Sequence, residues 1–388
     1  MSSSEDVVLP IPNLKLAQHH FTLATPELSH LHDAAREQLL AGIEKDQMAP
    51  WYKHIASTTP TLQLDSTLLD KMEAQNKTEL DALDARLAEA EKTEGETEIS
   101  DALRARATYL TRIGDKENAV KAQELALSKT PGLGSRIDIV LTLTRIGFFF
   151  ADHALITENL TKAEELIEEG GDWDRRNRLK VYQGLHMLSI RSFKRGGELF
   201  IDALSTFTAN ELLEYNDFVT LCVIVNTLTL KRVDLKKKLL VAPEVTQVLL
   251  EVTDLADYTK SLYECHYDKF FVALATLEQK FLLPSRLLRA HARYYVREMR
   301  ILAYAQLLES YRSLTLESMA RAFGVSVDFI DNELARFIST GRLNCTIDKV
   351  NGVVETNRPS AKNARYETVV KQGDILLNSI QRLSKVLY

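Results

Sequence analysis

The sequence lacks the features of an exported, membrane-bound or disulfide-bonded protein. Its 388 residues contain three cysteines, which stand far apart and form no CxxC pair. Separated cysteines in odd number build neither a disulfide framework nor a zinc-ligand set, and they favour a reducing compartment. The acidic N-terminus has no basic and apolar leader, and no apolar run approaches the ~18 residues that a membrane-spanning helix needs. We therefore expect a soluble chain with no membrane partner.

Motifs of catalysis and cofactor binding are lacking as well. The sequence has no P-loop and no GxGxxG turn that would hold a phosphate group. His30 and His32 lack the further ligands of a metalloprotease site, so a surface loop is the better interpretation. Cys265 and His266 are adjacent, and adjacent residues on a helix point ~100° apart, which does not suit a nucleophile and its base. The sequence predicts no enzyme, no metal site and no cofactor.

The overall charge gives no sign of a polyanionic partner. The formal net charge is −6, so no general field would attract nucleic acid. A hydrophobic share of 45% and a charged share of 26% are the balance of a folded globular protein. At this length we expect either two or three domains or an extended repeat array.

Proline is scarce, which favours long helices. Five of the nine prolines fall within the first 60 residues, and none interrupts residues 61–130 or 132–242. Residues 1–60 show little regular pattern apart from a short helical stretch at 34–43, so we interpret them as an arm that caps or docks. Residues 61–210 are predicted to form an acidic helix followed by helical repeats.

The acidic helix predicted within residues 68–98 carries one apolar seam. Its members, spaced 3-4-3, are Leu80, Leu83, Leu87 and Ala90. Such a seam needs a surface to pack against. We favour packing on the next helices of the chain over a free-standing coiled coil, because a coiled coil needs far more than one heptad.

A sequence triplet recurs further along the array. Arg112-Ile113-Gly114 returns as Arg145-Ile146-Gly147, 33 residues later. Each copy is predicted to end a helix, with glycine at the corner of a helix pair, where a left-handed backbone costs least. The spacing is close to the ~34 residues of a tetratricopeptide unit, and a third pair with drifted spacing follows at residues 177–206. Stacked helix pairs present a curved surface suited to binding other proteins.

Residues 211–356 are predicted to contain a helical part and then a winged helix from about residue 314. Apolar spacing there predicts a short helix, a turn at Gly324 and a second helix that ends at Gly341. Alternating residues and the turn Asn351-Gly352 predict a hairpin, which would be the wing.

A winged helix raises the question of nucleic-acid binding. The second helix carries Asp328, Asp331 and Glu333 against a single Arg336, and phosphate groups would repel it. We therefore favour protein binding and keep nucleic-acid binding as the alternative.

Residues 357–388 are predicted to form a terminal helix with its apolar side chains on one face. The members of this seam are Val369, Leu376, Ile380, Leu383 and Leu387. We predict that the seam is an assembly interface, which acts by becoming buried in a helical bundle.

Two basic clusters remain. One consists of Lys231, Arg232, Lys236, Lys237 and Lys238. The other has steps of 3-4-4-3, which would align its members along one helical face: Arg286, Arg289, Arg293, Arg297 and Arg300. Two interpretations of the arginines are equally supported, a solvated face with salt bridges and a docking stripe for an acidic partner surface.

The order of the parts resembles the PCI-domain family of scaffold subunits, in which helical repeats precede a winged helix and a terminal amphipathic helix. Members of this family are shared by the proteasome lid, the signalosome and a translation initiation factor. Particular stretches are similar to the proteasome-lid branch of the family and extend the likeness over nearly the whole chain: residues 48–50, 112–116, 168–184, 294–300, 307–315 and 347–359.

The resemblance implies an all-α fold, with a tetratricopeptide-like solenoid, a winged-helix PCI module and a C-terminal helix. It also implies a non-catalytic scaffold subunit of a hetero-oligomer in the cytoplasm and nucleus. The implied partners are other PCI and lid subunits of the proteasome regulatory particle and the ATPase base. A subunit of the signalosome or of an initiation-factor complex is the alternative, followed by a nucleic-acid-binding winged-helix protein.

Overall fold

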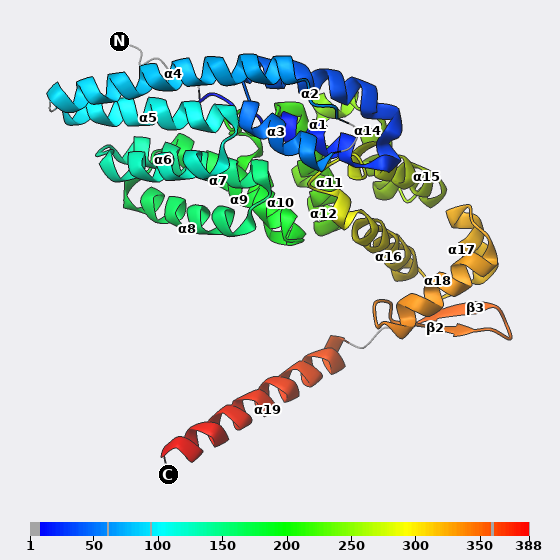
Figure 1. The fold of residues 1–388 in the computed structure, drawn as a ribbon. Helices are drawn as coiled ribbons and strands as arrows, with labels where there is room; N and C mark the ends of the chain where they lie inside the picture. The colour runs from blue at the N-terminus through cyan, green and yellow to red at the C-terminus, as the bar shows by residue number, and fades with distance from the viewer. Residues whose placement is uncertain (1–7, 60–61, 94, 358–360, 388) are drawn as a thin grey trace. The chain divides into compact units, whose positions relative to one another are not determined.

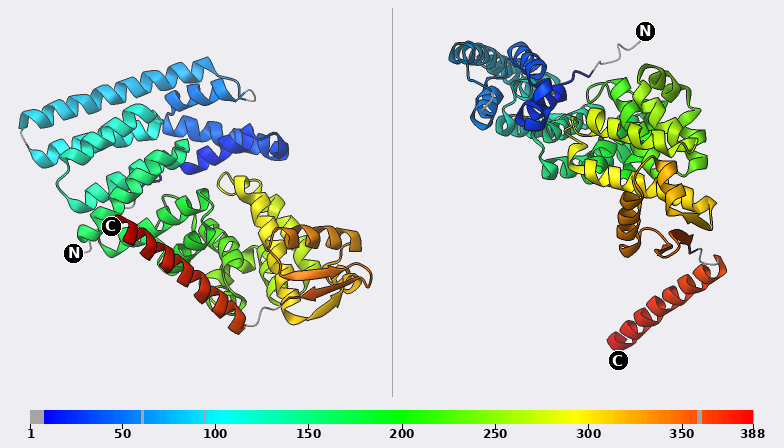
Figure 2. Two further views of the ribbon diagram at one scale, coloured as in Figure 1. Left: turned by 90° about the horizontal axis from the view of Figure 1, so that it is seen from below. Right: turned by 90° about the vertical axis from the view of Figure 1, so that its right-hand side faces the viewer.

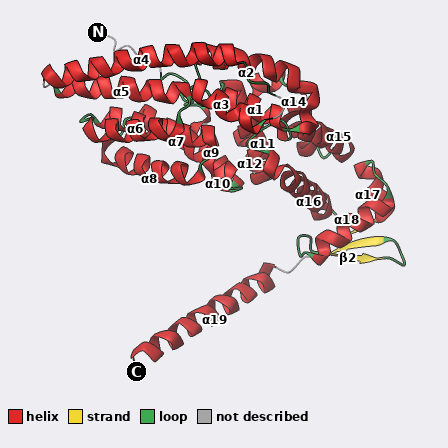
Figure 3. Cartoon of the chain, viewed as in Figure 1, coloured by secondary structure: helices red, strands yellow, loops and turns green. Residues whose placement is uncertain are grey.

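The computed structural model describes residues 8–59, 62–93, 95–357 and 361–387. Helices dominate the described residues, and three short strands lie between residues 313 and 356 (Figure 3). The chain divides into two compact units, residues 1–263 with 273–296 and residues 264–272 with 297–388. The predicted fold class, helical repeats followed by a winged helix and a terminal helix, is confirmed.

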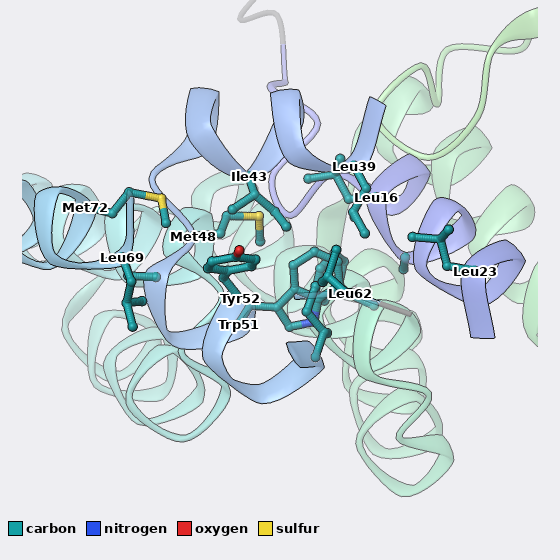
Figure 4. Close-up of a cluster of buried hydrophobic side chains, with 14 of the residues drawn as sticks. Leu16, Leu23, Leu39, Ile43, Met48, Trp51, Tyr52, Leu62, Leu69 and Met72 are labelled. Atoms are coloured by element: carbon teal, nitrogen blue, oxygen red, sulfur yellow. The ribbon is translucent and has the colours of Figure 1, made fainter. Parts of the chain in front are cut away.

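The N-terminal arm is more regular than its sequence suggested. Pro26 and Pro50 stand in the first turn of a helix, where a missing N–H costs no hydrogen bond, so they begin helices instead of breaking them. The side chains of Leu39, Ile43 and Tyr52 are buried in the core that the arm encloses (Figure 4). The helical segments are α1 (Leu14–Ala24), the 3-10 turn η1 (Pro26–Leu31), α2 (His32–Asp46) and α3 (Ala49–Thr58).

The helical array follows the arm, and each of its helices packs on its neighbour in sequence (Figures 1 and 2). Leu80, Leu83 and Leu87 of the acidic helix pack against a core formed by the next three helices, so the prediction of an internally covered seam is confirmed. The helices are α4 (Ser66–Thr93), α5 (Glu96–Ile113), α6 (Lys116–Lys129), α7 (Leu133–Phe150), α8 (His153–Gly170), α9 (Trp173–Ser189) and α10 (Phe193–Leu204).

The helix corner predicted at the second copy of the triplet is wrong. Gly114 does end α5, in a left-handed conformation with φ +77°. Gly147, however, lies inside α7, which continues to Phe150 and is capped by Ala151 with φ +56°. Gly147 is needed for packing instead, because a β-carbon there would lie 2.7 Å from Cγ1 of Ile156 on α8. The triplets repeat in sequence without being equivalent in structure.

Further helices, of 4 to 19 residues, follow the array in the chain and precede the winged helix. The aromatic side chains of Phe218, Tyr258 and Phe270 are buried there. The segments are α11 (Tyr215–Thr229), α12 (Arg232–Leu235), the π-helical turn η2 (Lys236–Leu240), α13 (Pro243–Glu251), α14 (Thr253–Tyr263), α15 (Tyr267–Leu277), the π-helical turn η3 (Glu278–Leu282), the 3-10 turn η4 (Arg289–His291) and α16 (Ala292–Ser310).

The winged helix forms as predicted, with one strand that the sequence did not reveal. The strands are antiparallel in the order β1-β3-β2, and Leu314 of the additional strand β1 pairs with Val354. Met319, Ile330 and Leu334, which lie on its two helices, are fully buried. The elements are β1 (Ser313–Thr315), α17 (Leu316–Phe323), α18 (Val327–Ser339), β2 (Cys345–Asp348) and β3 (Val353–Thr356).

Candidate assembly surfaces

The terminal helix α19 (Ala361–Leu387), red in Figure 1, exposes its apolar face to solvent. Its seam residues keep more than half of their surface exposed: Val369 65%, Leu376 62%, Ile380 55% and Leu383 61%. The side chain of Leu387, the fifth predicted member, lies outside the described residues. Large apolar side chains are rarely left in water along a whole helix, so this exposed face is a candidate assembly surface.

The apolar surface of α19 is wider than the predicted seam. At ~100° per residue the four described seam residues fall within an arc of about 60°. Three further exposed apolar residues widen that arc on one side: Tyr366, Val370 and Leu377. Ile375, which is 67% exposed, lies on a different face. An arc of this width suits the core of a helical bundle better than the narrow seam of a two-stranded coiled coil.

The acidic residues of α18 are largely neutralised inside the winged helix. Asp331 forms an ion pair with Lys349 of the wing at 2.9 Å. Glu333 pairs with Arg300 at 2.9 Å and accepts a hydrogen bond from the hydroxyl of Tyr304 at 2.8 Å. Burial and the nearby Glu333 carboxylate raise the pKa of Tyr304. The charge argument against nucleic-acid binding therefore rests mainly on Asp328, and it is weaker than the sequence suggested.

The tip of the wing presents an apolar side chain on a hydrogen-bonded turn. The carboxylate of Asp348 accepts hydrogen bonds from the backbone N–H groups of Val350 at 3.0 Å and Asn351 at 3.3 Å. The side chain of Val350 is 94% exposed. Val327 and Phe329, at the start of α18, are also exposed. The winged helix thus carries apolar surface of its own in addition to that of α19.

The prediction that five arginines form one helical stripe is wrong. Helix α16 begins at Ala292, so Arg286 and Arg289 lie before it and only Arg293, Arg297 and Arg300 are on it. Arg300 is paired with Glu333, as described above, and Arg297 lies 3.3 Å from Glu298. Arg293 and Arg297 are exposed. A docking surface for an acidic partner would therefore be limited to these two residues.

Arg286 and Arg289 instead hold the N-terminal arm. The guanidinium of Arg286 donates to the carbonyl of Phe149 at 3.0 Å, and its backbone N–H donates to Oε1 of Gln18 at 2.9 Å. Burial lowers the pKa of Arg286. Arg289 pairs with Glu27 at 2.5 Å. These two arginines are structural groups that fix the arm. This role could not be predicted from local spacing, because their partners are remote in the chain.

Cys265 and His266, which are adjacent in sequence, contact different residues in the structure. The thiol of Cys265 accepts a hydrogen bond from the amide of Gln306 at 3.1 Å, whereas His266 lies 3.7 Å from Glu264. Among the described residues, no three His, Cys, Asp or Glu side chains gather in a metal-binding cluster. Within the same part of the chain, no helix combines the length and the apolar character that crossing a membrane requires.

The fold, a helical array followed by a winged helix and a terminal helix, is that of the PCI class of proteins. Residues 255–358 match the model of the PCI domain. Residues 65–238 match the model described as 26S proteasome subunit RPN7, and residues 365–387 match the 26S proteasome regulatory subunit RPN7/PSMD6 C-terminal helix.

Comparison with individual proteins narrows the class further. The chain is 46% identical to the 26S proteasome non-ATPase regulatory subunit 6 homolog of Arabidopsis thaliana, over 97% of each chain. It is 42% identical to the 26S proteasome non-ATPase regulatory subunit 6 of Dictyostelium discoideum, over 99% of each. The COP9 signalosome complex subunit 1 of A. thaliana is 24% identical over 51% of this chain and 45% of that protein. This chain belongs to the family of 26S proteasome non-ATPase regulatory subunit 6.

Proposed function

We propose that this chain is a non-catalytic scaffold subunit of the lid of the 26S proteasome regulatory particle. It supports assembly of the complex that degrades ubiquitinated proteins. The observation that carries the proposal is the exposed apolar face of α19, which extends through the residues that match the family's C-terminal helix. Full burial of a Leu, Ile or Val side chain contributes ~1.5–3 kcal/mol, so four such residues have enough apolar surface to drive association.

The proposed division of labour follows the four parts of the chain. Residues 1–60 form the arm, 61–210 the repeats, 211–356 the PCI domain and 357–388 the helix for bundle assembly. The winged helix associates with other PCI subunits and α19 joins their helices in a bundle, while the repeats contact neighbours or the ATPase base. Arg293 and Arg297 are a docking site for an acidic neighbour.

Affinity purification of the tagged full-length chain tests this proposal directly. A version that ends at Asn363 lacks nearly all of α19 and serves as the comparison. We expect lid subunits to be recovered with the full chain and to be lost or strongly reduced with the truncated one. Far-ultraviolet circular dichroism and thermal unfolding of the truncated chain should show that the remaining helices stay folded, because α19 contributes no buried apolar side chain among its described residues.

Two alternatives have distinct outcomes in the same experiment. Recovery of signalosome or initiation-factor subunits in place of lid subunits would reassign the chain to another PCI assembly. Recovery of neither, together with salt-sensitive binding of the purified chain to duplex DNA or RNA below 1 μM, about the limit of specific binding, would favour the nucleic-acid alternative. Hydrolase activity that survives purification and depends on one side chain would contradict the non-catalytic role.

The location of the chain follows from membership of the proteasome. We infer that it resides in the cytoplasm and the nucleus as part of a hetero-oligomer, without nucleic acid or membrane as a partner. Fractionation of cells that express the tagged chain should place it with assembled proteasomes in both compartments.

A further inference from the structure

The basic cluster at residues 231–238 has no role in the function proposed above. All five of its cationic side chains are exposed. Many lysines and arginines form ion pairs elsewhere in the described ranges. No ion pair within those ranges includes a lysine or arginine of this cluster. The segment contains a single carboxylate, Asp234. The chain thus holds a concentrated positive surface that its own described residues do not neutralise.

Two members of the cluster are fixed against one aromatic ring. The guanidinium of Arg232 lies 5.1 Å from the ring centre of Tyr263 and donates to the carbonyl of that residue at 2.7 Å. The ammonium of Lys236 lies 5.8 Å from the same ring centre. These contacts hold the segment in place and occupy the ring. Lys231, Lys237 and Lys238 have no such contact, and of these three Lys237 and Lys238 are the adjacent pair on the π-helical turn.

The π-helical turn brings apolar residues into line with these lysines. Residues 236–240 form the turn, in which the N–H of Val241 donates to the carbonyl of Lys236 at 3.1 Å. At the ~100° rotation per residue of an α-helix, the side chains of Val233 and Val241 would point ~80° apart. The π-helical turn is wider and rotates by only ~80° per residue over its five residues, which brings the two valines back to one face. Val233 is 65% exposed and Val241 is 64% exposed. Lys237 lies between them in the same line.

We propose that this surface, Val233, Lys237, Lys238 and Val241, docks an acidic amphipathic helix of another subunit. A helix laid along the line would cover both valines with its apolar residues and would place carboxylates against Lys237, between the valines, and against the neighbouring Lys238. Nucleic acid fits less well, because phosphate groups gain nothing from two exposed valines and the chain as a whole is negatively charged. This inference rests on the proposed function, since the partner is a neighbour in the assembled particle.

Chemical labelling of the purified assembly tests the surface in place. A carbodiimide condenses a lysine amine with a carboxylate in contact, with loss of water, and so reports the partner residue. We expect Lys237 or Lys238 to be joined to Asp or Glu on a helix of another subunit. We also expect both lysines to react with an acetylating reagent at least tenfold more slowly in the assembly than in the isolated chain. Equal acetylation rates, or protection that nuclease treatment removes, would overturn the proposal.

Substitutions separate this surface from the rest of the assembly interface. The pair K237E/K238E should lower retention of the crosslinked subunit at least tenfold, and V233S/V241S should lower it as well, because the partner uses both charge and apolar contact. The matched control is K194E/R195E, which reverses two adjacent exposed cations on α10 and should leave retention within twofold. Unchanged retention in K237E/K238E would refute the inference. Failure of the unaltered chain to enter the lid at all would refute the proposed function instead.

Discussion

Replacing Leu376 and Ile380 by alanine should weaken assembly and leave the isolated chain intact. Both side chains are more than half exposed, so their truncation removes no contact of a core. Alanine also has a higher helix propensity than leucine or isoleucine, so α19 should remain helical. The substitution therefore isolates the contribution of apolar burial in the assembled particle.

The expected magnitude follows from the surface that is still available for burial. Full burial of a Leu or Ile side chain contributes ~1.5–3 kcal/mol. Leu376 is 62% exposed and Ile380 is 55% exposed, so each can still contribute about 1–2 kcal/mol on association. Replacing both residues by alanine should therefore weaken the free energy of binding by about 2–4 kcal/mol. Since 1.4 kcal/mol is a factor of ten, the affinity should fall about 30- to 700-fold.

The assay is titration of the full-length chain into lid particles reconstituted without this subunit, with the bound fraction measured by quantitative mass spectrometry. The control pair, Asn378→Ala and Gln381→Ala, lies on the same helix and outside the seam, and it should change the affinity by no more than about twofold. Circular dichroism of each isolated chain should give the same unfolding temperature.

Three results would refute this reasoning, each in a different way. An unchanged affinity of the Leu376 and Ile380 variant would show that the seam is not buried in the particle. Equal losses in both pairs would trace the effect to the helix as a whole. A lower unfolding temperature of the isolated variant would show that the seam packs within its own chain.

Three further predictions concern stability. Gly147→Val should destabilise the repeat array by ~1–3 kcal/mol in thermal unfolding, because a β-carbon would crowd a side chain of α8, whereas Gly373→Ala meets no atom within 4 Å and should not destabilise. Glu333→Gln should lower the free energy of unfolding of the winged helix by ~1–3 kcal/mol in denaturant titration, since it leaves the partly screened charge of Arg300 unpaired. Burial raises the pKa of Tyr295, so on raising the pH the unfolded state loses the hydroxyl proton first. The stability that neutral Tyr295 contributes to the folded state is therefore fully present below pH ~10 and is lost as the pH rises above it. Unfolding temperatures measured from pH 8 to 11 should fall at the alkaline end, less steeply in Tyr295→Phe.

The winged helix could be predicted from sequence because short-range chemistry determines its turns. Gly324 and Gly352 both have positive φ angles in the structure, at +66° and +62°, and glycine adopts that conformation without strain. The apolar spacing between those turns then determines which faces are buried. Strand β1 was missed because three residues carry no periodic pattern, and it exists only through pairing with β3.

Arrangements that depend on distant residues could not be predicted. The arginine steps continue through residues 286–300 as if one helix ran throughout, yet α16 begins at Ala292. The break is held by contacts of the preceding segment with the arm, and the residue that binds the backbone of Arg286 is Gln18, 268 positions earlier. Periodicity predicts which side chains would share a face if a helix formed, but not where that helix begins. Here long-range hydrogen bonds determine its first residue.

The seams of α4 and α19 show why amphipathic spacing alone does not distinguish fold from assembly. Both helices place apolar residues at steps of three and four, and both leave polar residues on the other faces. Leu80 and Leu83 of α4 are covered because α5 and its successors follow at once in the chain and supply a matching core. Leu376 and Leu383 of α19 are exposed, because no neighbouring helix follows α19 among the described residues and none of the described cores includes it. A seam with no matching surface in its own chain gains its burial energy only from a partner, so stability of the subunit and affinity for the particle should respond to different substitutions.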